Sequence, residues 1–143
     1  MAGTVAIGIQ QFNEIRKKGY FYIDKTAFIR EWWEKGDSVT LITRPRRFGK
    51  TLTMSMVEQF FSVKYAGQQN LFEGLAIWET KAYREIQGTY PVISLSFANL
   101  KEPSYELTRQ KVCDQLQQLY TEHAYIWESG ILKGADKSFF ERM

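Results

Sequence analysis

The residues whose types and spacing most clearly suggest a chemical function run from Arg44 to Thr51 and read RPRRFGKT. Gly49, Lys50 and Thr51 match the end of the phosphate-binding loop G-x-x-x-x-G-K-[ST]. In that loop, backbone N–H groups, a lysine and a hydroxyl hold the phosphates and Mg²⁺ of a nucleotide. The position of the first glycine is occupied by Arg44, which is followed by Pro45. Two alternatives follow, a nucleotide site or a basic turn.

Positive charge is concentrated in this stretch. Four cations lie within seven residues, at Arg44, Arg46, Arg47 and Lys50. The net charge of the whole chain is only +3, which by itself does not indicate a protein that binds nucleic acid or membranes. The candidate anion site is therefore this one loop rather than the surface as a whole.

The segments on either side of the loop are those that the motif requires. The β-branched, apolar run from Val39 to Thr43 predicts a short buried strand. After the loop, apolar side chains recur at helical spacing, at Leu52, Met56, Val57, Phe60 and Phe61. A strand before the motif and a helix after it favour a genuine phosphate-binding loop over a chance match.

The motif then predicts a role in nucleotide binding for the residues of the loop. Lys50 would reach the β- and γ-phosphates, Thr51 would offer its hydroxyl to Mg²⁺, and the helix N-terminus would face the anion. Pro45 favours an extended Arg44, so that a glycine is not needed there, and the arginine side chain either narrows the site or reaches the nucleotide. The predicted nucleotide-binding set is Arg44, Pro45, Arg46, Arg47, Phe48, Gly49, Lys50, Thr51 and Leu52.

The rest of the chain predicts helices and one more strand. A short helix containing Phe12 and Ile15 ends at Gly19, and a longer helix begins after Asp24 as its N-cap and ends at Gly36. The run YPVISLSF alternates as a strand does, and a long helix is expected from Ser104 to about Glu128. Strands alternating with helices predict an α/β fold.

Composition limits the remaining classes. Cys113 is the only cysteine, which excludes an intrachain disulfide, and we expect it to be a small buried apolar residue. No apolar run approaches the ~18 residues that span a bilayer, and the first residues lack the features of a signal peptide. We therefore expect a cytoplasmic protein with no membrane role.

Several stretches resemble the N-terminal part of the bacterial AAA-ATPase-like domain family, whose members often carry a PD-(D/E)XK nuclease-like region further along. The stretches are IGIQQFNEIRKKGYFYIDKTAFI, LITRPRRFGKTLTMSM, LFEGL and YPVISLSFANLK. The resemblance implies a P-loop NTPase-like fold that binds ATP and Mg²⁺. In this family an arginine is expected at the position of the first glycine of the loop.

The piece YIDKT also resembles the N-terminal motif of archaeal-type ATPases, in which this segment lies against the adenine. That likeness implies adenine-side roles for Tyr22, Ile23, Asp24 and Lys25. The alternative is structural, with Asp24 only a helix cap and Tyr22 only a core residue.

ATP hydrolysis in such enzymes needs an apolar strand ending in Asp or Asp-Glu, which the sequence lacks. The family places that strand beyond Met143. We therefore expect one partial P-loop domain over residues 1–143, with a helical lead-in (1–37) and a P-loop core (38–143) that carries the N-terminal portion of a parallel sheet flanked by helices. We expect no catalytic residue and no ATP turnover by the chain alone.

An incomplete sheet would leave an edge and apolar helix faces uncovered, and we expect self-association through them. The faces concerned would lie around Phe60, Phe61, Trp78 and Phe139. Two alternatives to nucleotide binding remain. One is a nucleic-acid-binding module that uses the arginine loop on backbone phosphates, a role also open to the full-length protein, and the other is an inert truncated fragment.

Overall fold

The computed structural model describes residues 4–5, 8–45, 49–98 and 100–142, without the side chain of Phe140. The chain divides into two compact units, one up to Val92 and one from Ile93 onwards. Among the described residues, none of the helices is long and apolar enough to cross a bilayer.

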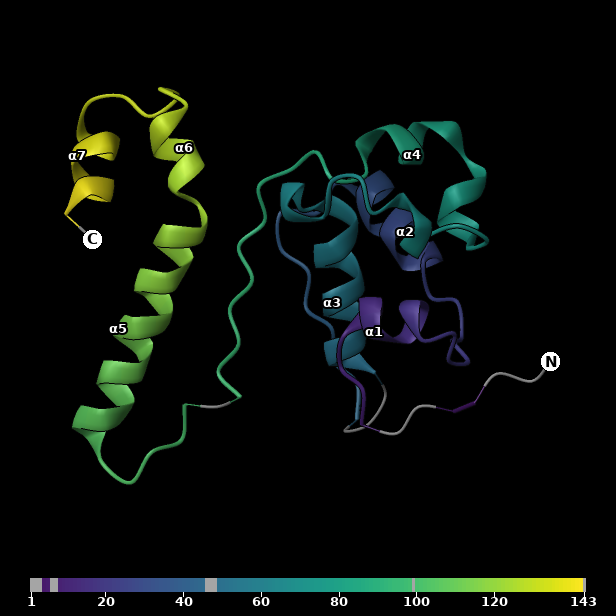
Figure 1. Cartoon of the computed structure of the whole chain (residues 1–143), viewed down its shortest axis with the longest axis horizontal. Helices are drawn as coiled ribbons and strands as arrows, with labels where there is room; N and C mark the ends of the chain where they lie inside the picture. The colour runs from purple at the N-terminus through teal and green to yellow at the C-terminus, as the bar shows by residue number, and fades with distance from the viewer. Residues whose placement is uncertain (1–3, 6–7, 46–48, 99, 143) are drawn as a thin grey trace. The chain divides into compact units, whose positions relative to one another are not determined.

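The first unit is built from short helices (Figure 1). Its α-helices are α1 (Phe12–Lys17), α2 (Ala27–Lys35), α3 (Lys50–Phe61) and α4 (Lys81–Ile86), and its 3-10 helices are η1 (Val63–Tyr65), η2 (Gln69–Leu71) and η3 (Ala76–Glu79). Helix α3 packs against α1, and η3 packs against both α2 and α4. The helices predicted around Phe12, after Asp24 and after the loop are confirmed as α1, α2 and α3, and so are the turns at Gly19 and Gly36 that follow the first two.

A cluster of aromatic rings joins these elements. Phe12, Phe60 and Phe72 are completely buried, and the ring of Phe72 lies 5.1 Å from each of the other two. Helix α2 is attached through Trp33, whose ring stacks on Phe61 at 5.4 Å. Burying several large rings in one place makes a large favourable contribution to the free energy of folding.

One glycine lets the chain after α4 pass close to the rest of the unit. Gly88 has φ of +69°, and a Cβ added to it would lie 2.7 Å from the Cα of Ala66. Its N–H donates to the carbonyl of Phe60 at 2.8 Å. The chain after α4 therefore reaches the end of α3 only because this residue has no side chain.

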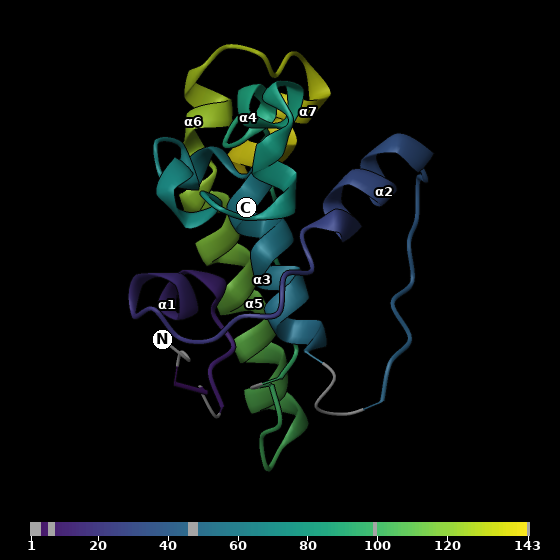
Figure 2. The same ribbon diagram turned by 90° about the vertical axis from the view of Figure 1, so that its right-hand side faces the viewer.

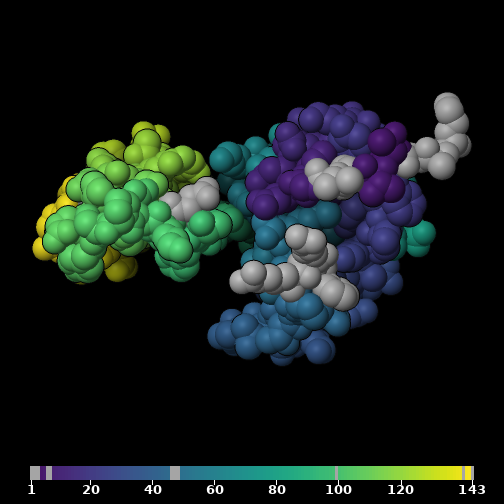
Figure 3. Space-filling model, turned by 90° about the horizontal axis from the view of Figure 1, so that it is seen from below, coloured from purple at the N-terminus to yellow at the C-terminus, as the bar shows by residue number. Residues whose placement is uncertain are grey.

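The expected α/β fold with a parallel sheet is wrong. In the described residues the only β-pairing is an isolated parallel bridge between Ser62 and Tyr90, and the unit is otherwise helical. The predicted buried strand at 39–43 is extended but unpaired, and Val39 and Leu41 are 87% and 83% exposed. Figures 2 and 3 show this segment running along the outer edge of the first unit.

The predicted strand in YPVISLSF is also absent, because only Tyr90 takes part in the bridge and Ile93 and Phe97 are exposed. The physical reason is the same for both segments. Branched and aromatic side chains favour an extended backbone, but a strand forms only when a neighbour takes its N–H and C=O groups.

The second unit contains α5 (Tyr105–Glu122), α6 (Ala124–Glu128) and α7 (Ala135–Glu141). The predicted cap at Ser104 is confirmed, since its Oγ accepts a hydrogen bond from the N–H of Leu107 at 3.3 Å. The single helix expected up to Glu128 is instead interrupted at His123, whose ring Nδ1 lies 2.8 Å from the carbonyl oxygen of Leu119.

Burial in the second unit is shallow. The predicted apolar face of α5 is only half-buried, and no residue of that helix is fully buried. Cys113, expected inside, is exposed. The expectation that Phe60 and Phe61 lie on an uncovered face is wrong, because both are core residues of the first unit, whereas Phe139 in α7 is exposed.

Candidate functional site

Helix α3 begins where the phosphate-loop motif predicts. Gly49 is the residue before its first turn and has φ of +74°, in the left-handed region that glycine adopts without strain. Its carbonyl accepts the first hydrogen bond of the helix, from the N–H of Thr53 at 2.9 Å. Lys50 and Thr51 therefore open a twelve-residue helix, whose first N–H groups have no partner within the helix.

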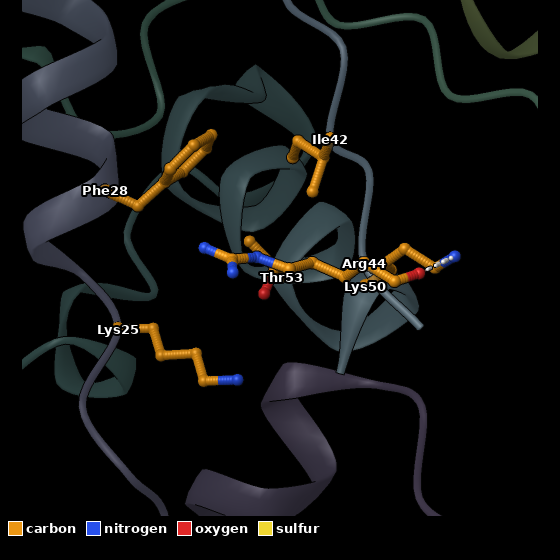
Figure 4. A pocket seen from close by; sticks show the side chains of 6 residues that line it. All are labelled: Lys25, Phe28, Ile42, Arg44, Lys50 and Thr53. Atoms are coloured by element: carbon orange, nitrogen blue, oxygen red, sulfur yellow. Dashed lines mark hydrogen bonds between the residues drawn. The ribbon is translucent and has the colours of Figure 1, made fainter. Parts of the chain in front are cut away.

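A cavity of about 310 Å³ lies beside this helix start (Figure 4). Its described lining consists of Lys25, Phe28, Ile42, Arg44, Lys50 and Thr53. Three of these side chains are cationic and two are apolar, and no carboxylate is among them. The cavity therefore combines strong positive charge with an apolar side, which suits an anion that carries an apolar or aromatic group.

Arg44 and Lys50 point to different sides of the loop. In Figure 4 the guanidinium of Arg44 extends into the space towards Lys25 and Phe28. The ammonium of Lys50 points the other way and donates to the carbonyl oxygen of Arg44 at 2.8 Å. Of the two alternatives for the arginine, the geometry favours the one in which its side chain reaches into the site.

Among the described residues, only part of the predicted nucleotide-binding set lines the cavity. Arg44 and Lys50 line the cavity, whereas Pro45 and Thr51 are exposed and Leu52 packs against the core. The expectations for Arg46, Arg47 and Phe48 lie outside the described residues. These assignments, including Thr51 as a magnesium ligand, stay predictions.

Three lining residues were missed by the sequence argument. Thr53 lies three residues after Lys50 on α3, so helical spacing could have identified it. Phe28 and Ile42 belong to α2 and to the extended segment before the loop. Their meeting depends on how these elements pack, for which the sequence carries no local signal.

The lead-in residues before α2 are held by specific contacts. The Tyr22 hydroxyl donates to the sulfur of Met56 at 3.1 Å and accepts from the N–H of Lys25 at 3.4 Å. Its ring meets that of Phe12 edge-on at 5.3 Å, and burial raises the pKa of Tyr22 to about 12. The side chain of Ile23 is 67% exposed and is not part of the described cavity lining.

Asp24 is not the N-cap of α2, because Thr26 occupies that position. Its Oδ1 accepts hydrogen bonds from the N–H and hydroxyl of Thr26 at 2.8 and 2.6 Å, and its Oδ2 accepts from the N–H of Ala76 at 2.7 Å. Burial alone would raise the pKa of Asp24, but these hydrogen bonds and the charge of Arg16 outweigh burial and lower it. The carboxylate therefore has a structural role at the start of α2.

The donor set fits a phosphate group better than a bare metal ion. Within the described residues there is no group of three or more His, Cys, Asp or Glu side chains that could hold a metal. A Cβ on Gly49 would lie 3.2 Å from Nζ of Lys25, so a side chain at this position would crowd the Lys25 ammonium. A divalent cation would have to arrive with the phosphates that it neutralises.

Comparisons with known proteins agree with the motif. An uncharacterized protein in the vnfD 5′ region of Azotobacter chroococcum mcd 1 is 38% identical over 92 residues, which cover 64% of this chain and 16% of that protein. The chain therefore matches about a sixth of the length of this relative. No solved structure matches. The sequence profile of predicted AAA-ATPases matches residues 6–142, and the chain belongs to that family.

Proposed function

We propose that the cavity beside the N-terminus of α3 binds a nucleoside triphosphate, with ATP and Mg²⁺ as the ligand pair. The observation that carries the proposal is that the ammonium of Lys25 and the guanidinium of Arg44 extend into one cavity, which Lys50 also lines, next to the left-handed turn at Gly49. Membership of a family of predicted AAA-ATPases supports the same ligand.

The charge and dipoles at the site favour a polyphosphate. Three cationic side chains line the cavity, and those of Lys25 and Arg44 extend into it. Charge-assisted hydrogen bonds to phosphate are about twice as strong as neutral ones. The first N–H groups of α3 and its positive end add a favourable interaction with an anion. Lys50 would exchange its hydrogen bond to the Arg44 carbonyl for one to phosphate.

The apolar part of the cavity favours a nucleotide over inorganic phosphate alone. Phe28 and Ile42 form that part, and the Arg44 guanidinium extends towards Phe28. An aromatic ring beside a phosphate site is suited to the base or ribose. A nucleic-acid backbone, in contrast, would need a long cationic track rather than one pocket of about 310 Å³.

ATP hydrolysis is a separate matter from binding. Phosphoryl transfer to water needs an acidic group that places the metal ion and the attacking water, and no carboxylate lines the described cavity. We propose that this chain binds Mg-ATP with negligible turnover, and that hydrolysis depends on residues contributed elsewhere in longer members of the family.

Thermal unfolding with and without Mg-ATP tests the proposal. A ligand that binds only the folded protein at about 100 times its Kd stabilises it by about 2.7 kcal/mol, which would raise the Tm by roughly 5 °C or more. Lys50→Ala should abolish this shift. The matched control is Lys81→Ala, which removes an exposed lysine at the start of α4 and should keep the shift.

Equal shifts in wild type and Lys50→Ala would contradict the proposal. Binding that falls steeply with salt and is insensitive to Mg²⁺ would instead favour the nucleic-acid alternative. Phosphate release by wild type that Lys50→Ala abolishes would show that a metal-organising carboxylate exists in this chain and that the account of turnover is wrong.

A further inference from the structure

Lys25 lies between two residues that are tied to another part of the first unit. The carboxylate of Asp24 accepts from the N–H of Ala76, and the hydroxyl of Thr26 accepts from the N–H of Ile77 at 3.2 Å. Both acceptors thus bind the start of η3, one on each side of Lys25 in the chain. The carbonyl of Lys25 also accepts the N–H of Phe28 at 3.0 Å.

This double anchor fixes the backbone from which the Lys25 side chain leaves. Thr26 is completely buried, and its hydroxyl also donates to Asp24, so that the two anchors support each other. The neighbouring Tyr22 hydroxyl accepts the N–H of Lys25. The backbone at Lys25 is thus ordered before a ligand binds, which lowers the entropy cost of ordering this segment on binding.

The side chain itself crosses to the phosphate loop. Nζ of Lys25 lies 3.2 Å from the position that a Cβ on Gly49 would occupy. Figure 4 shows the ammonium pointing from the α2 side towards the loop, into the same space as the Arg44 guanidinium. The charged end of Lys25 therefore sits beside the glycine whose backbone a bound phosphate would touch.

We propose that Lys25 is a second phosphate-binding lysine, which contacts the polyphosphate from the side opposite Lys50. The proposal rests on the proposed nucleotide site and goes beyond it by adding the lead-in segment as a ligand-binding element. In the segment Asp24-Lys25-Thr26, the two outer residues then fix the backbone by hydrogen bonds to η3, and the lysine supplies the positive charge that binds phosphate. Resemblance alone implies an adenine-side role for the same lysine.

The two roles give different results with ligands that contain only part of ATP. Calorimetric titrations of Mg-ATP and of Mg-tripolyphosphate are carried out with wild type, Lys25→Ala and Lys25→Gln. If Lys25 binds phosphate, both substitutions should weaken the binding of both ligands by about tenfold or more, because each removes a charge-assisted hydrogen bond to phosphate. The matched control is Lys35→Ala, at the other end of α2, which should change either affinity by less than about twofold.

Two outcomes would overturn the proposal. If Lys25→Ala weakens the binding of Mg-ATP but not that of Mg-tripolyphosphate, the lysine lies on the adenine side. If Lys25→Ala behaves as Lys35→Ala does while Lys50→Ala loses binding, Lys25 has no role and the nucleotide site stands. Failure of wild type to bind Mg-ATP would instead contradict the proposed function. Far-ultraviolet circular dichroism of each variant, matched to wild type, assigns a loss of affinity to the site rather than to unfolding.

Discussion

In the unit that ends at Val92, Phe12, Phe60 and Phe72 are completely buried, whereas among the described apolar residues of the unit that begins at Ile93 only Leu100 falls in the buried class. Both units are helical and rich in aromatic residues. They differ in whether their helices cover one another, so helix formation alone does not create a core. The candidate site belongs to the unit with the core, which can hold side chains in fixed positions.

The largest expected difference between the units concerns phenylalanine. Phe72→Ala should destabilise the first unit by about 3–5 kcal/mol, because it removes a fully buried ring and leaves a cavity. Phe97→Ala makes the same chemical change at a residue that is 66% exposed, and should cost less than about 0.5 kcal/mol. Urea unfolding followed by circular dichroism measures both, and similar losses would contradict the comparison.

A smaller effect tests how tightly the first unit is packed. Gly88→Ala adds a methyl group that would sit 2.7 Å from the Cα of Ala66 at a positive φ, and should cost about 3 kcal/mol. Gly74→Ala is the matched control, since Gly74 also has a positive φ but its Cβ would meet nothing within 4 Å. That change should cost about 1 kcal/mol. Equal costs would show that the chain after α4 gives way and that its approach to Ala66 is not a constraint.

The smallest effect concerns the anchor beside the site and depends on pH. Because folding lowers the pKa of Asp24 below its ordinary value of 3.8, its carboxylate stabilises the folded state above that pH. The stabilisation is lost as the pH falls through the folded pKa. Asp24→Asn should therefore cost about 1 kcal/mol at pH 7, a modest value because solvent screens this partly exposed group.

Stability measured from pH 7 to pH 2 provides the check. The free energy of unfolding of the wild type should approach that of Asp24→Asn as the pH falls below 3.8, so that the two stability curves converge in acid. Asp37→Asn removes a carboxylate from an exposed position just after α2 and serves as the control, with a curve close to wild type. A constant gap between wild type and Asp24→Asn at every pH would mean that the carboxylate charge is not what stabilises the turn.

Local sequence signals predicted the helices and the start of the site. The spacing of Leu52, Met56 and Phe60 places one face of α3 inward, and the Gly49-Lys50 pair marks its first turn. Those signals act within a few residues, and the structure follows them closely. Phe28 and Ile42 could not be assigned to the cavity, because their meeting depends on the packing of α2 and of the extended segment before the loop.

The failed strand predictions have the same cause. Val39 and Leu41 favour an extended backbone, and the segment is indeed extended, but burial and pairing depend on distant partners that local pattern does not specify. Cys113 was expected inside because no neighbour in the sequence indicated a reactive thiol, yet it is exposed and lies on α5, a helix without a fully buried residue.

The central claim is that the cavity between Lys25 and the start of α3 holds a nucleotide. Backbone amide chemical shifts of the ¹⁵N-labelled protein, followed during titration with Mg-ATP, test it most directly because they locate the ligand without a substitution. The account predicts saturable changes at Lys25, at Phe28 and from Gly49 to Thr53, with residues after Ile93 unaffected. Absence of saturable changes, or changes spread over exposed lysines and arginines away from the cavity, would contradict it.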